Sequence, residues 1–271
     1  MASPAASDKK LVEFVPQNTT VLISVRAGDA LTDPDLITLQ DILSESGEAG
    51  DSFSSLEQGL NEITDSLGLD LRSVNEVLLF FTDLSGASDS VSSLGGSDED
   101  IQGAVIFRAS YNREKFVTTI EEEEGPAQIS QYNGHELLTT EAGTVISFLS
   151  ENTIVLGEAS GVQAVVDVLE GDAASLSGQM RSTFNDLGSP WIKMVVQPSK
   201  ADLESVLQEE GTDFGLLGGT PPFLDAFAQL SIVSVTLDNV DSTFVLHAIM
   251  DFETAGAATE AGDGMDGLLK T

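Results

Sequence analysis

The alternation of apolar and polar positions is clearest between residues 128 and 169, where it predicts four short strands followed by a helix. Asn133-Gly134 separates the first two strands, and this dipeptide is a strong hairpin signal because a type I′ turn needs positive φ at both central positions. Polar breaks then divide the remaining strands, at 136–140, 144–149 and 153–157. The pattern predicts an antiparallel meander.

The helix predicted after the meander has one apolar stripe. Val162, Val165, Val166 and Leu169 fall at i, i+3, i+4 and i+7, which places them on one helical face that can lie on the sheet. Ser160 precedes this stripe and is predicted to cap the helix.

The rest of the chain is predicted to alternate between β-branched runs and helical stripes. Predicted strands cover residues 20–26, 74–82, 103–109, 191–197, 232–237 and 243–252. Helices are predicted after Asp33-Pro34, over 53–67, after Asn112, over 176–187, after Ser199, after 220–222 and over 254–271. Residues 83–100, rich in Ser, Gly and Asp, are predicted to form a long link.

Two stretches, 20–124 and 190–271, share one order of elements: strand, helix, helix, strand, strand, helix. The predicted fold class is therefore α+β, with two related units of antiparallel sheet and helices packed on one face. We assign residues 1–19 to a tether and lead-in, 20–189 to the first unit with its meander, and 190–271 to a second, incomplete unit. The open sheet edge of that second unit is expected to be covered by later residues, by the first unit's sheet, or by self-assembly or a protein partner.

Charge narrows the range of partners. The 271 residues include 45 acidic and 11 basic residues, a net charge of −34, so DNA and RNA would be repelled over most of the surface. Acidic residues occur in nearly every segment, which favours a role in solubility over one acidic face for a basic partner. The chain has no cysteine, which excludes disulfides and thiolate chemistry.

No apolar run approaches the ~20 residues of a membrane span. The first ten residues are small and polar and end in Asp8-Lys9-Lys10. They are interpreted as a tether from which an upstream signal or anchor has been removed.

Few residues suggest chemistry. His135 follows the Asn-Gly turn and His247 lies inside a predicted strand, where packing is the simpler explanation. The stretch 211–219 is rich in glycine but lacks the Gly-Lys-Ser/Thr ending of a phosphate loop. Asp98, Glu99 and Asp100 place three carboxylates in the predicted link, which makes them candidate calcium ligands, although a solvated charge run is the simpler explanation. No catalytic residue and no cofactor is predicted.

A series of segments carries a resemblance to known proteins: Phe14-Val15-Pro16, Thr20–Arg26, Gly68-Leu69-Asp70-Leu71, Tyr132-Asn133-Gly134, Thr153–Gly157 and Gly161–Glu170. Over about residues 11–190 the chain resembles uncharacterised prokaryotic envelope proteins, in which a signal peptide or lipid anchor precedes repeated α+β units. The resemblance implies a location outside the cytoplasm and a non-enzymatic role.

Three functions follow in order of support. The first is a non-catalytic extracytoplasmic or cell-surface binding or structural module. The second is an acidic cytoplasmic protein of a salt-accumulating organism. The third is a hydrolase that uses carboxylates or a divalent metal.

Overall fold

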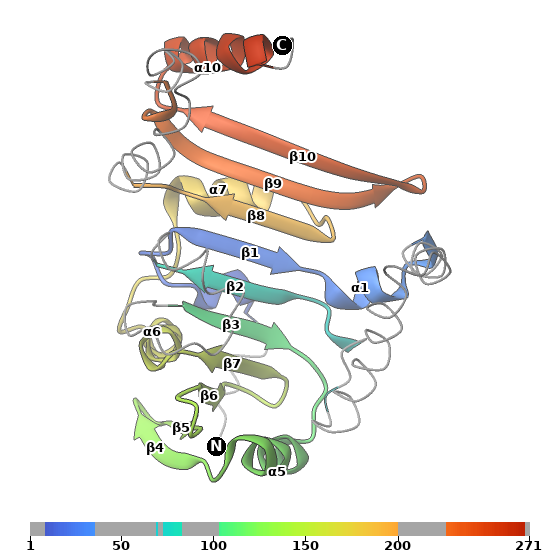
Figure 1. Ribbon diagram of the computed structural model, residues 1–271. Helices are drawn as coiled ribbons and strands as arrows, with labels where there is room; N and C mark the ends of the chain where they lie inside the picture. Colours follow the sequence, from blue (N-terminus) through green and yellow to red (C-terminus); the bar gives the residue numbers. More distant parts are fainter. Residues whose placement is uncertain (1–8, 36–68, 70–72, 83–102, 200–225, 269–271) are drawn as a thin grey trace.

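Ten strands form one antiparallel sheet in the described part of the chain. The computed structural model describes residues 9–35, 69, 73–82, 103–199 and 226–268. The strand order is β10-β9-β8-β1-β2-β3-β7-β6-β5-β4 (Figure 1). The α+β class predicted from the sequence is confirmed.

The strands are β1 (Val21–Val25), β2 (Val77–Phe81), β3 (Gly103–Arg108), β4 (Gln128–Tyr132), β5 (His135–Thr139), β6 (Val145–Phe148), β7 (Thr153–Gly157), β8 (Ile192–Val196), β9 (Leu230–Val240) and β10 (Thr243–Phe252). The helical segments are η1 (Leu11–Phe14), α1 (Ala27–Thr32), α5 (Arg113–Glu124), α6 (Ala159–Glu170), α7 (Gly178–Asp186) and α10 (Ala255–Leu268).

The predicted meander is present as β4 to β7. Asn133 and Gly134 have φ of 45° and 84°, which is the geometry that a type I′ turn requires. The predicted cap of the next helix was wrong: α6 begins at Ala159, and its N-cap is Glu158. The Val162 N–H donates to the Glu158 carbonyl, so the first helical hydrogen bond already closes there and Ser160 lies within the first turn.

Side chains alternate between two faces of the sheet, and each face has its own core. On the first face, which we call the α6 face, Leu78 and Ile106 of the central strands pack with Phe14 of η1, Val165 of α6 and Met180 of α7. On the opposite α5 face, a second cluster centres on Phe116 of α5. Its partners from the strands are Phe107, Ile146, Phe148 and Ile154. Helices were expected on one face, whereas the described helices contact both.

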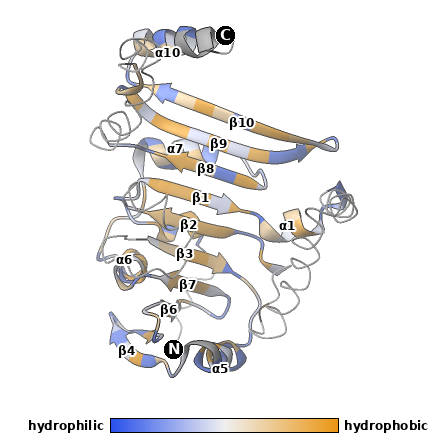
Figure 2. Cartoon of the chain, viewed as in Figure 1, coloured by the Kyte–Doolittle hydropathy of each residue, from blue (hydrophilic) through white to orange (hydrophobic). Residues whose placement is uncertain are grey.

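Hydropathy follows this arrangement. The central strands are apolar along most of their length (Figure 2), and every residue of β2 is buried or half-buried. A strand that is apolar at successive positions is stable only where both of its faces are covered. The clusters on the two faces explain why this strand shows no alternation.

The strands of the predicted first and second units meet at β1 and β8, the fourth and third strands from the β10 edge of the sheet. β1 pairs with β8, Val21 opposite Val196 and Val25 opposite Ile192, so this pairing is symmetric about its centre. On one side follow β2 and β3, and on the other β9 and β10. The division into two units stays a prediction, but the strands of both ranges belong to one sheet.

The β9–β10 hairpin is longer than the sequence predicted. The expected link over 238–242 is a two-residue turn, Asp241-Ser242, with φ of 51° and 62°. Aspartate tolerates positive φ better than most side chains, so this turn forms without glycine and the strands extend to it. The hairpin ends beside α10, where Ala257 and Ala261 cluster near Phe227 and Phe252.

Several predicted elements lie outside the described residues. These are most of the helix after Asp33-Pro34, the helix at 53–67, the link at 83–100, and the helices expected between 200 and 225.

Candidate functional site

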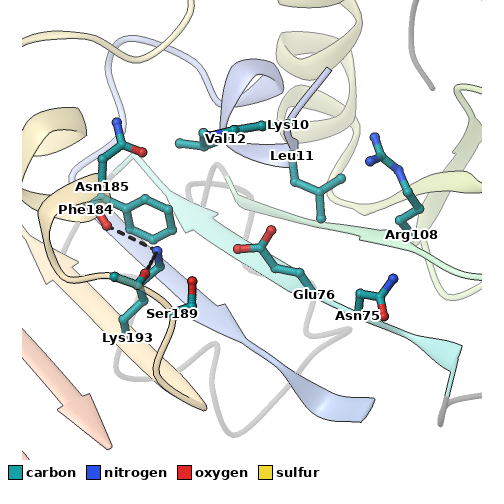
Figure 3. Close-up of a pocket in the computed structure, with 11 residues that line it drawn as sticks. Lys10, Leu11, Val12, Asn75, Glu76, Arg108, Phe184, Asn185, Ser189 and Lys193 are labelled. Atoms are coloured by element: carbon teal, nitrogen blue, oxygen red, sulfur yellow. Dashed lines mark hydrogen bonds between the residues drawn. The ribbon is translucent and has the colours of Figure 1, made fainter. Parts of the chain in front are cut away.

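A cavity of about 410 Å³ opens on the α6 face, beside the start of η1 and the end of α7. The strand register explains why polar side chains gather there. Ser24 on β1 lies between Lys193 on β8 and Leu78 on β2, and Leu78 in turn lies opposite Ile106 on β3. Glu76 lies two residues before Leu78 and Arg108 lies two residues after Ile106, so both point to the same face. Apolar residues on the α6 face therefore give way to charged residues at this end of the sheet (Figure 3).

The cavity carries more positive than negative side chains. Lys10, Arg108 and Lys193 line it together with one acidic residue, Glu76. The whole chain has 45 acidic and 11 basic residues, so the charge balance of the cavity is the reverse of the chain's. This reversal of charge distinguishes the cavity from the chain as a whole.

Lys193 is the buried cation of this group. Its side chain is held by two carbonyls, because Nζ donates to Phe184 O at 3.2 Å and to Gly188 O at 2.9 Å. Nζ also lies 3.8 Å from the centre of the Phe184 ring. Burial lowers the pKa of the Lys193 ammonium, an effect that Glu76 opposes and that Lys10 and Arg26 reinforce.

Glu76 and Arg108 are held in place by neighbours. The Ser24 hydroxyl donates to Glu76 Oε1 at 2.7 Å. Arg108 Nη2 donates to the Lys9 carbonyl at 2.7 Å, which ties the end of β3 to the residue before Lys10. Hydrogen bonds of this kind fix the orientation of charged side chains around a cavity.

Sequence reasoning missed this site. The signal available was Lys193 itself, a lysine inside the apolar run Trp-Ile-Lys-Met-Val-Val. A charged residue at an inward position of a strand indicates either a paired charge or a function. The other lining residues come from segments far apart in the chain, so only the fold brings them together.

The candidates that the sequence did suggest lie elsewhere. His135 Nε2 lies 2.9 Å from Glu170 Oε1, so this histidine links the meander to α6. His247 is exposed on β10. Asp98, Glu99 and Asp100, the candidate calcium ligands, lie outside the described residues, as does the glycine-rich stretch 211–219. The described residues contain no cluster of three acidic or histidine side chains placed to bind a metal.

A second candidate surface is the edge of the sheet at β10. This ten-residue strand pairs with β9, and within the described ranges no other strand pairs with it. Leu246 is 68% exposed and Ile249 is 51% exposed, and they point to opposite faces of the sheet. Phe244, 5.7 Å from Trp191 between ring centres, is 39% exposed. Asp251 is the only Asp, Glu, Lys or Arg residue of β10.

The opposite edge of the sheet is different. β4 has five residues, three of which are Gln or Ser, and Ile129 is its one large exposed apolar side chain, at 67%. Short and polar edge strands are a common protection against pairing with other chains. β10 lacks this protection along most of its length.

No protein-family model matches the sequence, and no curated protein is similar to it. Solved structures that resemble it include crystal form III of TP0453, with a TM-score of 0.49 and 10% identity over 92% of this chain and 82% of that chain. Crystal form I of TP0453 gives a TM-score of 0.48 and 9% identity over 92% and 81% of the two chains. No helix in the described ranges is long and apolar enough to cross a membrane.

Proposed function

We propose that this chain is a non-catalytic extracytoplasmic binding and structural module that assembles by pairing β10 with the β10 strand of a second copy. The observation that carries the proposal is the exposure of β10, a ten-residue edge strand with large apolar side chains open to solvent on both faces. Unpaired backbone N–H and C=O groups on such an edge form hydrogen bonds with any strand that aligns with it.

A second copy fits this edge because β10 is compatible with itself in antiparallel orientation. A two-fold axis at Ala248 would place Leu246 opposite Met250 of the other copy, an apolar pair of the kind that stabilises sheets. Asp251 would lie opposite Val245, so no like charges would face each other across the strands.

The net charge determines how such a pair would respond to salt. Two chains of −34 each repel one another, and salt screens this repulsion over about 10 Å at 0.1 M. Self-pairing should therefore strengthen as sodium chloride is raised. A basic partner protein would bind this chain less tightly as salt is raised. The direction of the salt dependence therefore distinguishes a second copy at β10 from a basic partner protein.

The location outside the cytoplasm rests on the resemblance of residues 11–190 to prokaryotic envelope proteins. An acidic cytoplasmic protein of a salt-accumulating organism is the alternative, and the two differ in where the chain is found. Immunodetection in intact native cells before and after protease treatment tests this part of the proposal. Loss of the signal from intact cells supports the surface location, and protection until lysis supports the cytoplasmic alternative.

Light scattering after size-exclusion chromatography tests the assembly. We expect a dimer whose fraction rises with protein concentration and from low to molar salt. Leu246→Lys should abolish it, because a lysine on an edge strand opposes pairing. Ile129→Lys is the matched control, since Ile129 is 67% exposed on the opposite edge, close to the 68% of Leu246. A monomer at all concentrations, or equal loss of assembly in both variants, would contradict the proposal.

A further inference from the structure

The cavity at the end of the α6 face is independent of β10, and its chemistry points to a second role. It is bounded by η1, by the residues before β2, by the end of β3 and by the connection from α7 to β8 (Figure 3). Its volume of about 410 Å³ lies within the range of small-molecule sites, roughly 300–1,000 Å³. The cavity is therefore large enough for a small metabolite.

The buried ammonium of Lys193 is the strongest indication of a ligand. Lys193 is 8% exposed, and none of the ion pairs formed by the described residues includes it. A buried cation is unfavourable unless an anion or hydrogen bonds compensate it. The Phe184 and Gly188 carbonyls accept two of its three hydrogens, which leaves one N–H for an acceptor in the cavity.

Other positive side chains line the cavity or lie near Lys193. Lys10 and Arg108 line the same cavity, and Arg26 adds to the positive potential at Lys193. Field lines concentrate in a concave site with low-dielectric walls, so an anion that enters is held more strongly there than on an open surface. Because the rest of the chain is acidic, large polyanions would be repelled while a small anion could enter.

Glu76 restricts the class of anion. It is the one carboxylate in the cavity lining, and the Ser24 hydroxyl holds its Oε1. A ligand with anionic groups at both ends would be repelled by Glu76, whereas a hydroxyl or ammonium group would donate to it. Leu11, Val12 and Phe184 supply an apolar wall for the body of the ligand.

We infer that this cavity binds a small organic anion, with one carboxylate or phosphate at Lys193 and a hydrogen-bond donor at Glu76. Lys10 adds charge at the anionic end, whereas Arg108 on β3 lies on the far side of Glu76 from Lys193 (Figure 3). The proposal concerns binding and involves no chemical step.

Titration by two-dimensional NMR with acetate, inorganic phosphate and glycine, at fixed ionic strength, tests the inference. We expect saturable shifts of the Glu76, Gly188 and Lys193 amides with at least one of the three probes. Comparing the affinities of acetate and phosphate shows whether the cavity prefers a carboxylate or a phosphate group. Glycine adds an ammonium donor, so it should bind more tightly than acetate. The absence of saturation with every probe would refute the inference.

Substitutions of Lys193 and Glu76, each compared with a control, test whether these two residues bind the anion. Lys193→Met should weaken binding by about tenfold or more, whereas Lys115→Met, the same change on the exposed surface of α5, should leave it unchanged. Equal affinities in the two variants would overturn the inference.

Glu76→Gln keeps the size of the side chain and removes its charge, so acetate should bind more tightly while glycine loses its advantage. This variant tests the proposal even if Lys193→Met does not fold, and an unchanged ratio of acetate to glycine affinity would contradict it.

Discussion

Replacing Gly161 with alanine tests how closely α6 packs against the sheet. Gly161 lies in the first turn of α6, and a Cβ atom built there would lie 2.2 Å from the Gly103 carbonyl oxygen and 2.6 Å from its carbon. Both atoms belong to the backbone of β3, which pairs with β2 on one side and β7 on the other. The strand cannot move independently, so α6 must shift away and loosen the packing of Val162 and Val165.

The expected magnitude follows from two opposing effects. Overpacking of a well-packed core costs about 1–3 kcal/mol. Alanine in place of glycine favours a helix by about 0.5–1 kcal/mol. Because the collision is with backbone atoms and is shorter than any ordinary contact, we expect the upper part of the range and a net loss of about 2 kcal/mol for Gly161→Ala. Gly262→Ala in α10 meets nothing within 4 Å, so only the helical gain of about 0.5–1 kcal/mol should remain.

Urea unfolding of both variants measures the difference. The single tryptophan, Trp191, is buried next to β8 and reports on this part of the sheet by fluorescence, and circular dichroism follows the helices. At an unchanged dependence on urea, the midpoint should fall for Gly161→Ala and rise for Gly262→Ala. If Gly161→Ala is as stable as the natural chain or more stable, the close approach of α6 to β3 is refuted.

Three further changes test the core, a helix cap and the cavity. Leu78→Ala, at a fully buried position on β2, should cost about 2–5 kcal/mol in urea unfolding, whereas Ile129→Ala, 67% exposed on β4, should change stability by less than about 0.5 kcal/mol. Asn112→Ala removes the acceptor of the Lys115 N–H at the start of α5 and should cost about 1 kcal/mol, measured by thermal unfolding followed by circular dichroism; no loss would show that the cap is dispensable. Burial lowers the pKa of Lys193 below 10.5, so between the folded pKa and 10.5 the unfolded chain binds more protons than the folded chain. The free energy of unfolding should therefore rise with pH over that window, as measured by urea unfolding at several pH values. Lys193→Met should show no such rise.

Local patterns predicted much of the fold. The Asn133-Gly134 turn, the stripe of Val162, Val165, Val166 and Leu169, and the cap at Asn112 all involve neighbours in sequence, and each is found in the structure. Such features depend on backbone preferences and on periodicity, which single segments contain in full.

Features that depend on contacts between distant segments were not predicted. The pairing of β1 with β8 joins residues about 170 positions apart, and no local signal determines it. The Asp241-Ser242 turn lacks the glycine that usually identifies a hairpin, so the hairpin was predicted with a longer link. The cavity combines Lys10, Glu76, Arg108 and Lys193 from four segments, which only the strand register brings together.

The central claim is that β10 pairs with a second copy of the chain. Amide hydrogen exchange at low and high protein concentration, in molar salt, measures this pairing directly, because a hydrogen-bonded edge exchanges more slowly than a free one. Within residues 243–252, the amides that point away from β9 should gain protection as concentration rises, while residues 128–132 on the opposite edge, Ile129 among them, should exchange at the same rate throughout. Unchanged exchange along β10 over the whole concentration range would contradict the account.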